Sequence, residues 1–543
     1  MPGHSTHQPH GSGVRGLNSP AGIDAPSGRF GRMFELPAAK FTEDDLFALA
    51  EAMKGEANLA EGPDPEESDF GAAYTYFGQF VDHDLTFDPS TFAQQKNDPN
   101  GIVDFRTPRF DLDNVYGRGP GDEPFLYDGR EKKLLLGQKL FLVERNPDAR
   151  DLPRSEATSD GTRRAIIGDP RNDENVIISQ LQGMMQRFHN RMVDIVTAGN
   201  ANVPFDDIQL EVRRHYQWVV LHDFLPKIVD KDILDSISPA IADPDGAFDK
   251  HPPKLRFYKF KEPRMPVEFS VAAYRLGHSM VRPAYRVNEF TTALAIFDHD
   301  NPTNGLNAFG DFPKSWAIDW QRFVDLGLRH GPETKTDRVQ RAYKIDTSLV
   351  EPLFNLPFSI AGDEARAKAR LLSLAFRNLL RGQLLLLPSG QDVARAMHFT
   401  PLTDQEIIIF KAEDGTQETD GEGGAKAPTI TDVSKAFAGK CPLWTYCLAE
   451  SRRNFYNKGQ ARLGQVGGTI VGETFLALMI ADETSIVHQP HWRPRFGLPF
   501  GLPEILKTAL GVFGRSGREL REDAPSRADR AVLPESRRVP TGV

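Results

Sequence analysis

The sequence contains only two cysteines, Cys441 and Cys447, among its 543 residues. A secreted enzyme of this size often carries several disulfide bridges, so the low count favours a reducing compartment or a fold that needs no covalent cross-links. The pair can form one local bridge, or the two residues can be separate small thiols. We prefer the second interpretation, because free cysteine is commonly buried as a small apolar residue.

Long apolar runs and a strong basic charge are also absent. The most apolar stretch, Thr469 to Ala481, is interrupted by Glu473 and is shorter than the roughly 20 residues that cross a bilayer. Residues 1–20 lack the apolar run of a signal peptide. The formal net charge of −10 provides no positive field for nucleic acid. The sequence therefore predicts no membrane span and no nucleic-acid partner. It slightly favours a cytoplasmic location over secretion without a recognisable signal peptide.

Apolar residues recur mainly at helical spacing. Residues 176–196 repeat them every three or four positions, and residues 212–229 and 371–387 behave similarly. Alternating, strand-like patterns are scarce and short. The two ends are polar, with few large apolar groups. The sequence therefore predicts a mainly α-helical protein with few short strands. It would form one large domain at residues 26–512, between a flexible N-terminal segment, 1–25, and a disordered polar tail, 513–543.

Residues 74–88 read YTYFGQFVDHDLTFD and predict a helix packed on the core. Gln79 and His83 are four positions apart, so their side chains leave the same face. His83 stands between two aspartates, Asp82 and Asp84. A single histidine on a helix is more often structural than catalytic, so this segment needs support from others.

Residues 106–117 read RTPRFDLDNVYG and place oxygen atoms at alternate positions. The donors are the Thr107 side chain, the Arg109 carbonyl and the carboxylates of Asp111 and Asp113. Alternate oxygens on a tight loop can surround Ca²⁺, which takes about 6–8 oxygen ligands, and Asp84 would complete the shell. The same spacing also occurs in plain surface loops, so both interpretations stay open on spacing alone.

Three further segments carry chemically useful side chains. Residues 168–175, GDPRNDEN, contain Arg171 and Glu174 just before a predicted helix. The simpler alternative is that Glu174 caps this helix while Arg171 is solvated. Residues 273–286, AYRLGHSMVRPAYR, and residues 377–390, RNLLRGQLLLLPSG, contribute the remaining candidates, which are Arg275, His278, Asn378 and Arg381.

These five segments, in this order, resemble the animal-type haem peroxidases of the peroxidase–cyclooxygenase superfamily. The resemblance implies a single helical domain built around a central haem b. It implies that His278 ligates the iron, with Arg275, Asn378 and Arg381 on the same, proximal side. On the distal side it implies three catalytic residues, which are Gln79, His83 and Arg171. It also implies a calcium shell made by Asp84, Thr107, Arg109, Asp111 and Asp113.

The resemblance also implies a covalent option. Asp82 and Glu174 match the positions that form ester bonds with haem methyl groups in the mammalian members. Asn175 follows Glu174 where a methionine would form a sulfonium bond, so we expect no sulfonium bond.

As an expectation from the family, the protein reduces hydrogen peroxide and oxidises an organic or halide donor through a ferryl intermediate, in a response to oxidative stress. A neutral His83 imidazole can take a proton from one peroxide oxygen and return it to the other. Arg171 would stabilise the charge on the departing oxygen, because its guanidinium stays protonated. Gln79 would order water or a small anion, and the Asn378 side-chain oxygen would accept a hydrogen bond from His278.

The sequence argues against two other functions. A fatty-acid dioxygenase of the same superfamily needs a radical tyrosine three residues before the proximal histidine. Arg275 occupies that position, and Tyr274, one residue earlier, is turned by about 100° on a helix. A non-catalytic binding protein on this scaffold would have lost His83 or Arg171, and both are present. The sequence names neither the small-molecule reductant nor the oligomeric state nor an export route.

Overall fold

The computed structural model describes residues 30–55, 62–87, 104, 106, 108–129, 132–141, 143–159, 161–243, 248–301, 304–307, 309–420 and 426–513. The predicted segment 1–25, residues 514–543 of the predicted tail, and Thr107 lie outside these ranges.

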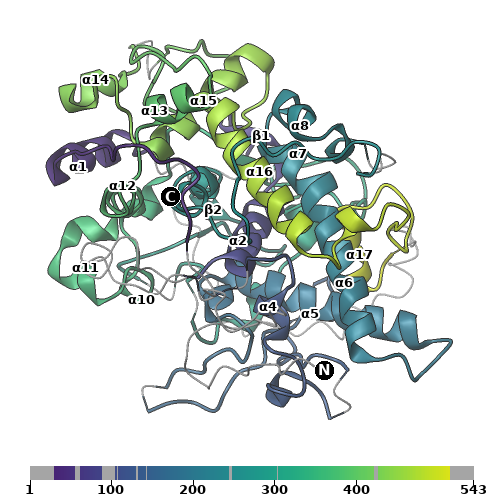
Figure 1. The fold of residues 1–543 in the computed structure, drawn as a ribbon. Coiled ribbons are helices and arrows are strands. Elements are labelled where there is room, and N and C mark those ends of the chain that lie inside the picture. Colours follow the sequence, from purple (N-terminus) through teal and green to yellow (C-terminus); the bar gives the residue numbers. More distant parts are fainter. Residues whose placement is uncertain are drawn as a thin grey trace.

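Helices dominate the described residues, as the periodicity predicts. The α-helices are α1 (Glu43–Ala52), α2 (Ala73–Leu85), α4 (Asp113–Tyr116), α5 (Val176–Thr197), α6 (Phe205–Val219), α7 (Leu225–Ile228), α8 (Lys231–Ile237), α9 (Val267–Val271), α10 (Phe358–Ala361), α11 (Asp363–Ala367), α12 (Leu374–Leu384), α13 (Gly390–Ala396), α14 (Ile430–Val433), α15 (Leu443–Lys458), α16 (Gln465–Ala481) and α17 (Leu502–Leu510). Figure 1 shows α2 near the middle of the molecule, with α5, α6 and α17 on one side and α10, α11 and α12 on the other.

Strands are few and short within the described residues. β1 (Glu67–Gly71) pairs antiparallel with β4 (Arg341–Tyr343), and β2 (Ala284–Tyr285) pairs antiparallel with β3 (Leu294–Ala295). A Cβ at Gly71 would lie 2.2 Å from the Phe323 carbonyl oxygen, so only glycine allows this close approach just before α2. The prediction of a mainly helical protein with few short strands is confirmed.

The predicted helix over 176–196 is α5, and its start has a specific cause. The Asn175 side-chain oxygen accepts hydrogen bonds from the backbone N–H groups of Ile177 (3.1 Å) and Ile178 (2.9 Å), an N-cap. Glu174 therefore does not cap this helix, and the simpler alternative for that residue is wrong. α17 packs along α5, covering part of its apolar face.

Two predicted helices differ from the observed ones. The pattern over 212–229 belongs to a helix that already begins at Phe205, continues through a π-helical turn, η3 (Val220–Phe224), and ends with α7. The segment around His278 is a short 3₁₀ helix, η5 (Ala273–His278), in place of an α-helix. At three residues per turn, His278 lies directly one turn after Arg275.

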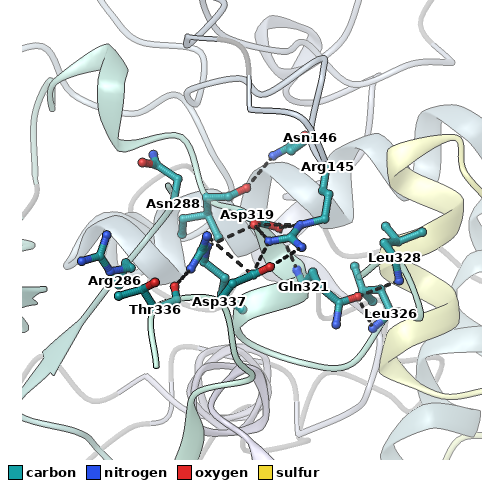
Figure 2. A network of polar contacts seen from close by, with 12 residues as sticks. Arg145, Asn146, Arg286, Asn288, Asp319, Gln321, Leu326, Leu328, Thr336 and Asp337 are labelled. Carbon is teal, nitrogen blue, oxygen red and sulfur yellow. Dashed lines mark hydrogen bonds and ion pairs between the residues drawn. The ribbon is translucent and has the colours of Figure 1, made fainter. Parts of the chain in front are cut away.

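The long, proline-rich connections are held by buried polar contacts. Figure 2 shows Arg145 donating hydrogen bonds to Asp319 (3.0 Å) and Asp337 (2.6 Å). Gln180 of α5 donates to the Trp316 carbonyl and accepts from the Ile318 N–H, each at 2.8 Å. The Gln180 bonds fix residues 316–318 to α5, and the Arg145 bonds fix Asp319 and Asp337 to the segment that contains Arg145.

The structure describes the two cysteines and the apolar segment that contains Glu473. Cys441 and Cys447 are both free and buried, so no local bridge joins them. Glu473 is buried in α16, where it accepts backbone hydrogen bonds from residues 256, 257 and 258. Across the described ranges, no helix combines the length and the hydropathy that crossing a membrane requires.

Candidate active site

A cavity of about 220 Å³ lies among α2, η5 and α12. The cavity brings together eight of the predicted site residues, which are Gln79, Asp82, His83, Glu174, Arg275, His278, Asn378 and Arg381. Its remaining wall is largely apolar, with Phe224, Leu276, Met280, Val281, Ile296, Phe297, Leu353, Leu356, Ile360 and Leu374.

His83 occupies the last turn of α2 and is 5% exposed. Its Nδ1 atom lies 2.7 Å from the side-chain oxygen of Asn172, in η2 (Pro170–Asp173). Burial, and next the Arg171 charge, lower the pKa of His83 to about 4. The imidazole is therefore neutral at pH 7 and can accept a proton.

Arg171 contacts the backbone of His83 and is not among the residues that line the cavity, and its catalytic role stays a prediction. Its Nη2 donates hydrogen bonds to the carbonyl oxygens of His83 (3.1 Å) and Thr86 (2.5 Å). The guanidinium also lies 4.6 Å from the centre of the Phe87 ring. The physical reason for this position is Asp169, two residues earlier, whose carboxylate pairs with Arg171 at 2.8 Å.

Asp169 is fully buried and was not identified from the sequence. It also pairs with Arg106, which in turn donates to Asp113 at 3.0 Å. Although burial raises the pKa of Asp169, Arg171 and Arg106 together hold that pKa far below its usual range. Its position in the GDPR segment, two residues before Arg171, is a signal that could have identified it.

Gln79 and Glu174 are hydrogen-bonded to each other inside the cavity. Gln79 Nε2 donates to Glu174 Oε1 at 3.0 Å, and Asn175 Nδ2 donates to Gln79 Oε1 at 3.5 Å. Burial raises the pKa of Glu174 to about 7, with Arg171 opposing that rise. Asp82, the second predicted carboxylate, accepts a hydrogen bond from the Thr86 hydroxyl at 3.2 Å.

His278 is held by Asn378, as predicted, but by the other end of the amide. Asn378 Nδ2 lies 2.7 Å from His278 Nδ1, whereas the sequence predicts the oxygen in that place. The Asn378 nitrogen can donate to His278 Nδ1 only when Nδ1 carries no proton, and the Asn378 oxygen can accept from Nδ1 only when Nδ1 carries one. A histidine that binds a metal through Nε2 carries its proton on Nδ1. Metal binding by His278 therefore requires the Asn378 amide to rotate by 180°, so that its oxygen faces Nδ1.

Arginines surround His278. Burial, and next the charges of Arg275 and Arg381, lower the pKa of His278 to about 3, so its ring is neutral at pH 7. Arg275 Nε donates to the Ser270 carbonyl at 2.8 Å. Arg377 also lines the cavity and donates to the Ala361 carbonyl at 2.8 Å. Arg377 was missed, although it stands beside Asn378 in the RNLLR segment.

Tyr274 lines the cavity, although Arg275 occupies the position three residues before His278. Its ring stacks on Phe269 with centroids 4.7 Å apart, and its hydroxyl donates to the Gly78 carbonyl at 3.3 Å. The one-residue shift therefore does not remove Tyr274 from the site.

Three buried carboxylates, Asp84, Asp111 and Asp113, bring ligand oxygens within 4.8 Å of one another. The Leu112 N–H and the Tyr216 hydroxyl interact with Asp84, and both of its carboxylate oxygens are buried. Burial, and next the charges of Asp111 and Asp113, raise the pKa of Asp84 well above its usual range. Arg109 is half-buried on the same loop. Three buried, mutually repelling carboxylates fit a hard cation.

The cavity residues also fit a haem. A flat, apolar macrocycle suits the apolar wall, a neutral imidazole such as His278 is a suitable axial ligand, and arginines can pair with propionates. The fit rests on the donor set and on the shared cavity.

Comparisons with known proteins show which proteins this chain is similar to. The family model for animal haem peroxidase matches residues 90–311. Thyroid peroxidase of Sus scrofa is 27% identical over 411 residues, which cover 72% of this chain and 39% of that protein. The chain thus spans about two fifths of the length of this curated relative. Arg171, Glu174, Arg275 and His278 lie inside the family match, whereas the α2 and α12 residues lie outside it.

Solved structures share the fold at low identity. Peroxidase A from Dictyostelium discoideum has a TM-score of 0.53 and 15% identity, covering 93% of this chain and 94% of that one. Fatty acid α-dioxygenase of Oryza sativa has a TM-score of 0.51 and 14% identity, covering 92% and 81%. The two scores are close, so the fold does not separate the two activities.

Proposed function

We propose that the chain is a haem-dependent peroxidase, because residues 90–311 match the family model for animal haem peroxidase, the family that the sequence resembles. The protein reduces hydrogen peroxide and oxidises a small organic or halide donor. The observation that carries the proposal is that one cavity contains two neutral histidines, His83 and His278, together with arginines and carboxylates.

His278 would bind the haem iron, and Arg275, Arg377 and Arg381 would pair with the propionates. When bound, the haem supplies the two-electron redox chemistry that peroxide reduction needs. Asn378 would fix the His278 ring by accepting a hydrogen bond from Nδ1, which makes the ring a stronger ligand.

His83 would hold the proton that moves between the peroxide oxygens. Its Nδ1 is occupied by Asn172, so Nε2 is the nitrogen left to accept that proton. The positive charge of Arg171 keeps the resting imidazole neutral and would favour release of the proton from the protonated ring. Its bonds to the His83 and Thr86 carbonyls also hold the end of α2. Gln79, bonded to Glu174, would orient water in the cavity.

We propose Ca²⁺ as a second cofactor, bound by Asp84, Asp111 and Asp113, with Thr107 and the Arg109 carbonyl as further ligands. The close approach of the three buried carboxylates and the effect of Asp111 and Asp113 on the pKa of Asp84 support this site. A divalent cation would offset the mutual repulsion of the carboxylates.

Ester bonds from Asp82 and Glu174 to the haem form a further part of the proposal, supported by both carboxylates lining the cavity. After treatment with peroxide, denaturation in acidic organic solvent should leave part of the haem on the wild-type protein. Glu174→Gln or Asp82→Asn should release more of it, because each substitution removes one attachment point. Complete extraction of haem from the treated wild type would show that no such bond forms.

A fatty-acid dioxygenase is the second candidate, supported by Tyr274 in the cavity wall and by the fold shared with the Oryza sativa enzyme. The deciding experiment offers the haem-loaded protein peroxide with bromide, iodide or a phenol, and separately oxygen with a polyunsaturated fatty acid. We expect donor oxidation only with peroxide. Oxygen uptake with the fatty acid, abolished in Tyr274→Phe and retained in the matched variant Tyr76→Phe, would establish the dioxygenase instead.

A further inference from the structure

Three hydrogen-bonded amides form a relay that ends on the His83 ring. They are the side chains of Asn172 and Gln182 and the backbone carbonyl of Asn114. Asn172 Oδ1 lies 2.7 Å from His83 Nδ1, Asn172 Nδ2 donates to Gln182 Oε1 at 2.9 Å, and Gln182 Nε2 donates to the Asn114 carbonyl at 3.3 Å. His83 is 5% exposed, and the three other residues are fully buried, so water does not compete for these bonds.

The Asn114 end of this relay determines how each side-chain amide in it is oriented. The Asn114 carbonyl can only accept, so Gln182 must present its nitrogen there and its oxygen to Asn172. Asn172 must then present its nitrogen to Gln182 and its oxygen to His83. An oxygen at 2.7 Å from Nδ1 requires a hydrogen on that nitrogen. The lone pair of the imidazole is thereby assigned to Nε2.

The Asn114 carbonyl is itself fixed. It belongs to α4, whose first residue is Asp113, and the Asn114 side chain donates to the Phe80 carbonyl of α2 at 3.1 Å. Gly168 packs against the same peptide, where a Cβ would lie 2.7 Å from the Asn114 oxygen. A larger residue at position 168 would push this peptide away from Gln182.

We propose that Asn172 is the positioning residue of the active site, selecting through Gln182 and Asn114 the His83 tautomer that leaves Nε2 free as the base. This inference rests on the proposed function and adds to it a residue that touches neither substrate nor cofactor. Asn172 fixes a ring that would otherwise adopt either tautomer and rotate about its Cβ–Cγ bond. The relay reaches His83 from α4 and α5, independently of the Arg171 contacts.

Two ligands separate this role from a purely structural one. Hydrogen cyanide must give up its proton to a base when it binds ferric haem, whereas carbon monoxide binds ferrous haem without any proton transfer. Loss of a correctly oriented base should slow cyanide association alone. A general disturbance of the cavity should change both rates.

The variants are Asn172→Leu, which removes the acceptor, and Asn172→Asp, which keeps an oxygen in its place. Gln182→Leu frees the Asn172 amide to turn over and tests the relay if Asn172→Leu binds no haem. Gln186→Leu is the matched control, a buried glutamine one turn further along α5 whose side-chain oxygen has no partner among the described residues. All are compared as haem-loaded full chains by stopped-flow absorption.

We expect Asn172→Leu to slow cyanide association by about 10–100-fold, the usual loss when a partner that orients a histidine is removed. Carbon monoxide association should stay within about threefold of wild type. Asn172→Asp should recover most of the cyanide rate, Gln182→Leu should show a smaller loss than Asn172→Leu, and Gln186→Leu should match wild type.

Wild-type cyanide rates in both Asn172→Leu and Gln182→Leu would overturn the proposal, as would equal losses for cyanide and carbon monoxide. The same holds if Asn172→Asp is as slow as Asn172→Leu. Failure of the proposed function looks different. In that case the wild type binds cyanide through a working relay yet does not oxidise any donor with peroxide.

Discussion

Asp169 is a buried carboxylate that holds two guanidinium groups, those of Arg106 and Arg171. Through Arg106 it reaches Asp113 of the carboxylate cluster, and through Arg171 it reaches the carbonyls of His83 and Thr86. One residue thus connects the proposed cation site with the end of α2. Its charge is essential to both contacts, because two buried guanidinium groups without a counter-charge are costly.

Asp169→Asn should destabilise the protein by about 3–5 kcal/mol near neutral pH, as expected when one member of a buried ionic cluster is removed. The folded-state pKa of Asp169 lies below its value in the unfolded chain, which is about 3.9. Its contribution is therefore fully present above about pH 5 and is lost as the pH falls toward the folded-state pKa. Urea unfolding of both proteins from pH 7 to pH 3 measures this.

The difference in unfolding free energy between wild type and Asp169→Asn should be constant at neutral pH and shrink below pH 4. Asp122→Asn, at an exposed position, serves as the control and should show no such difference. A difference that grows toward low pH would contradict the assignment of Asp169 as the ionised member of this cluster.

Sequence motifs predict which residues line the cavity better than they predict the hydrogen-bond and ion-pair partners of those residues. Eight predicted residues line one cavity, because each stands in a segment whose order and spacing are distinctive. Asn172 was missed because its partner His83 is 89 residues away in the chain. The position of the Arg171 side chain depends on Asp169, a neighbour that spacing alone does not single out.

At the scale of elements, α2 joins the two proposed cofactor sites. His83 and Asp84 are adjacent in its last turns, so successive side chains point about 100° apart, one to the cavity and one to the carboxylate cluster. A change in the cluster should therefore be felt at His83.

Removal of calcium, or Asp84→Ala, should lower the melting temperature, weaken haem binding and lower peroxidase activity together. The reason is that the cation would hold α2 against the loop before α4. Thermal unfolding followed at the haem absorption band, with and without a chelator, measures both effects. Asp122→Ala is the control. Full activity and unchanged melting after complete removal of Ca²⁺ would refute this coupling.

Periodicity predicts the long helices and fails for the short ones. α2 and α5 were predicted nearly to their ends, because each buries a continuous apolar face. The start of α6 was missed because residues 205–207 are polar or only partly buried. The 3₁₀ geometry of η5 leaves no periodic signal over six residues, since tertiary contacts rather than apolar spacing determine it.

For the whole molecule, the sequence predicts the class of fold and its family but not how the long connections are fixed. The bonds from Arg145 to Asp319 and Asp337 join residues 174 and 192 positions apart, and no local pattern announces them. The single domain at 26–512 stays a prediction. The central claim about the whole molecule is a division of labour, with His278 holding the haem and His83 moving the proton.

The most direct test mixes haem-loaded protein with hydrogen peroxide and follows the haem absorption band by stopped flow. His278→Ala should lack normal haem ligation. His83→Ala should keep its haem yet react about 10²–10⁴-fold more slowly, the loss expected for a positioned acid–base group. His299→Ala, a histidine outside the cavity wall, should react like wild type. If His83→Ala reacts with peroxide at the wild-type rate, His83 is not the base and the proposed catalytic site is wrong.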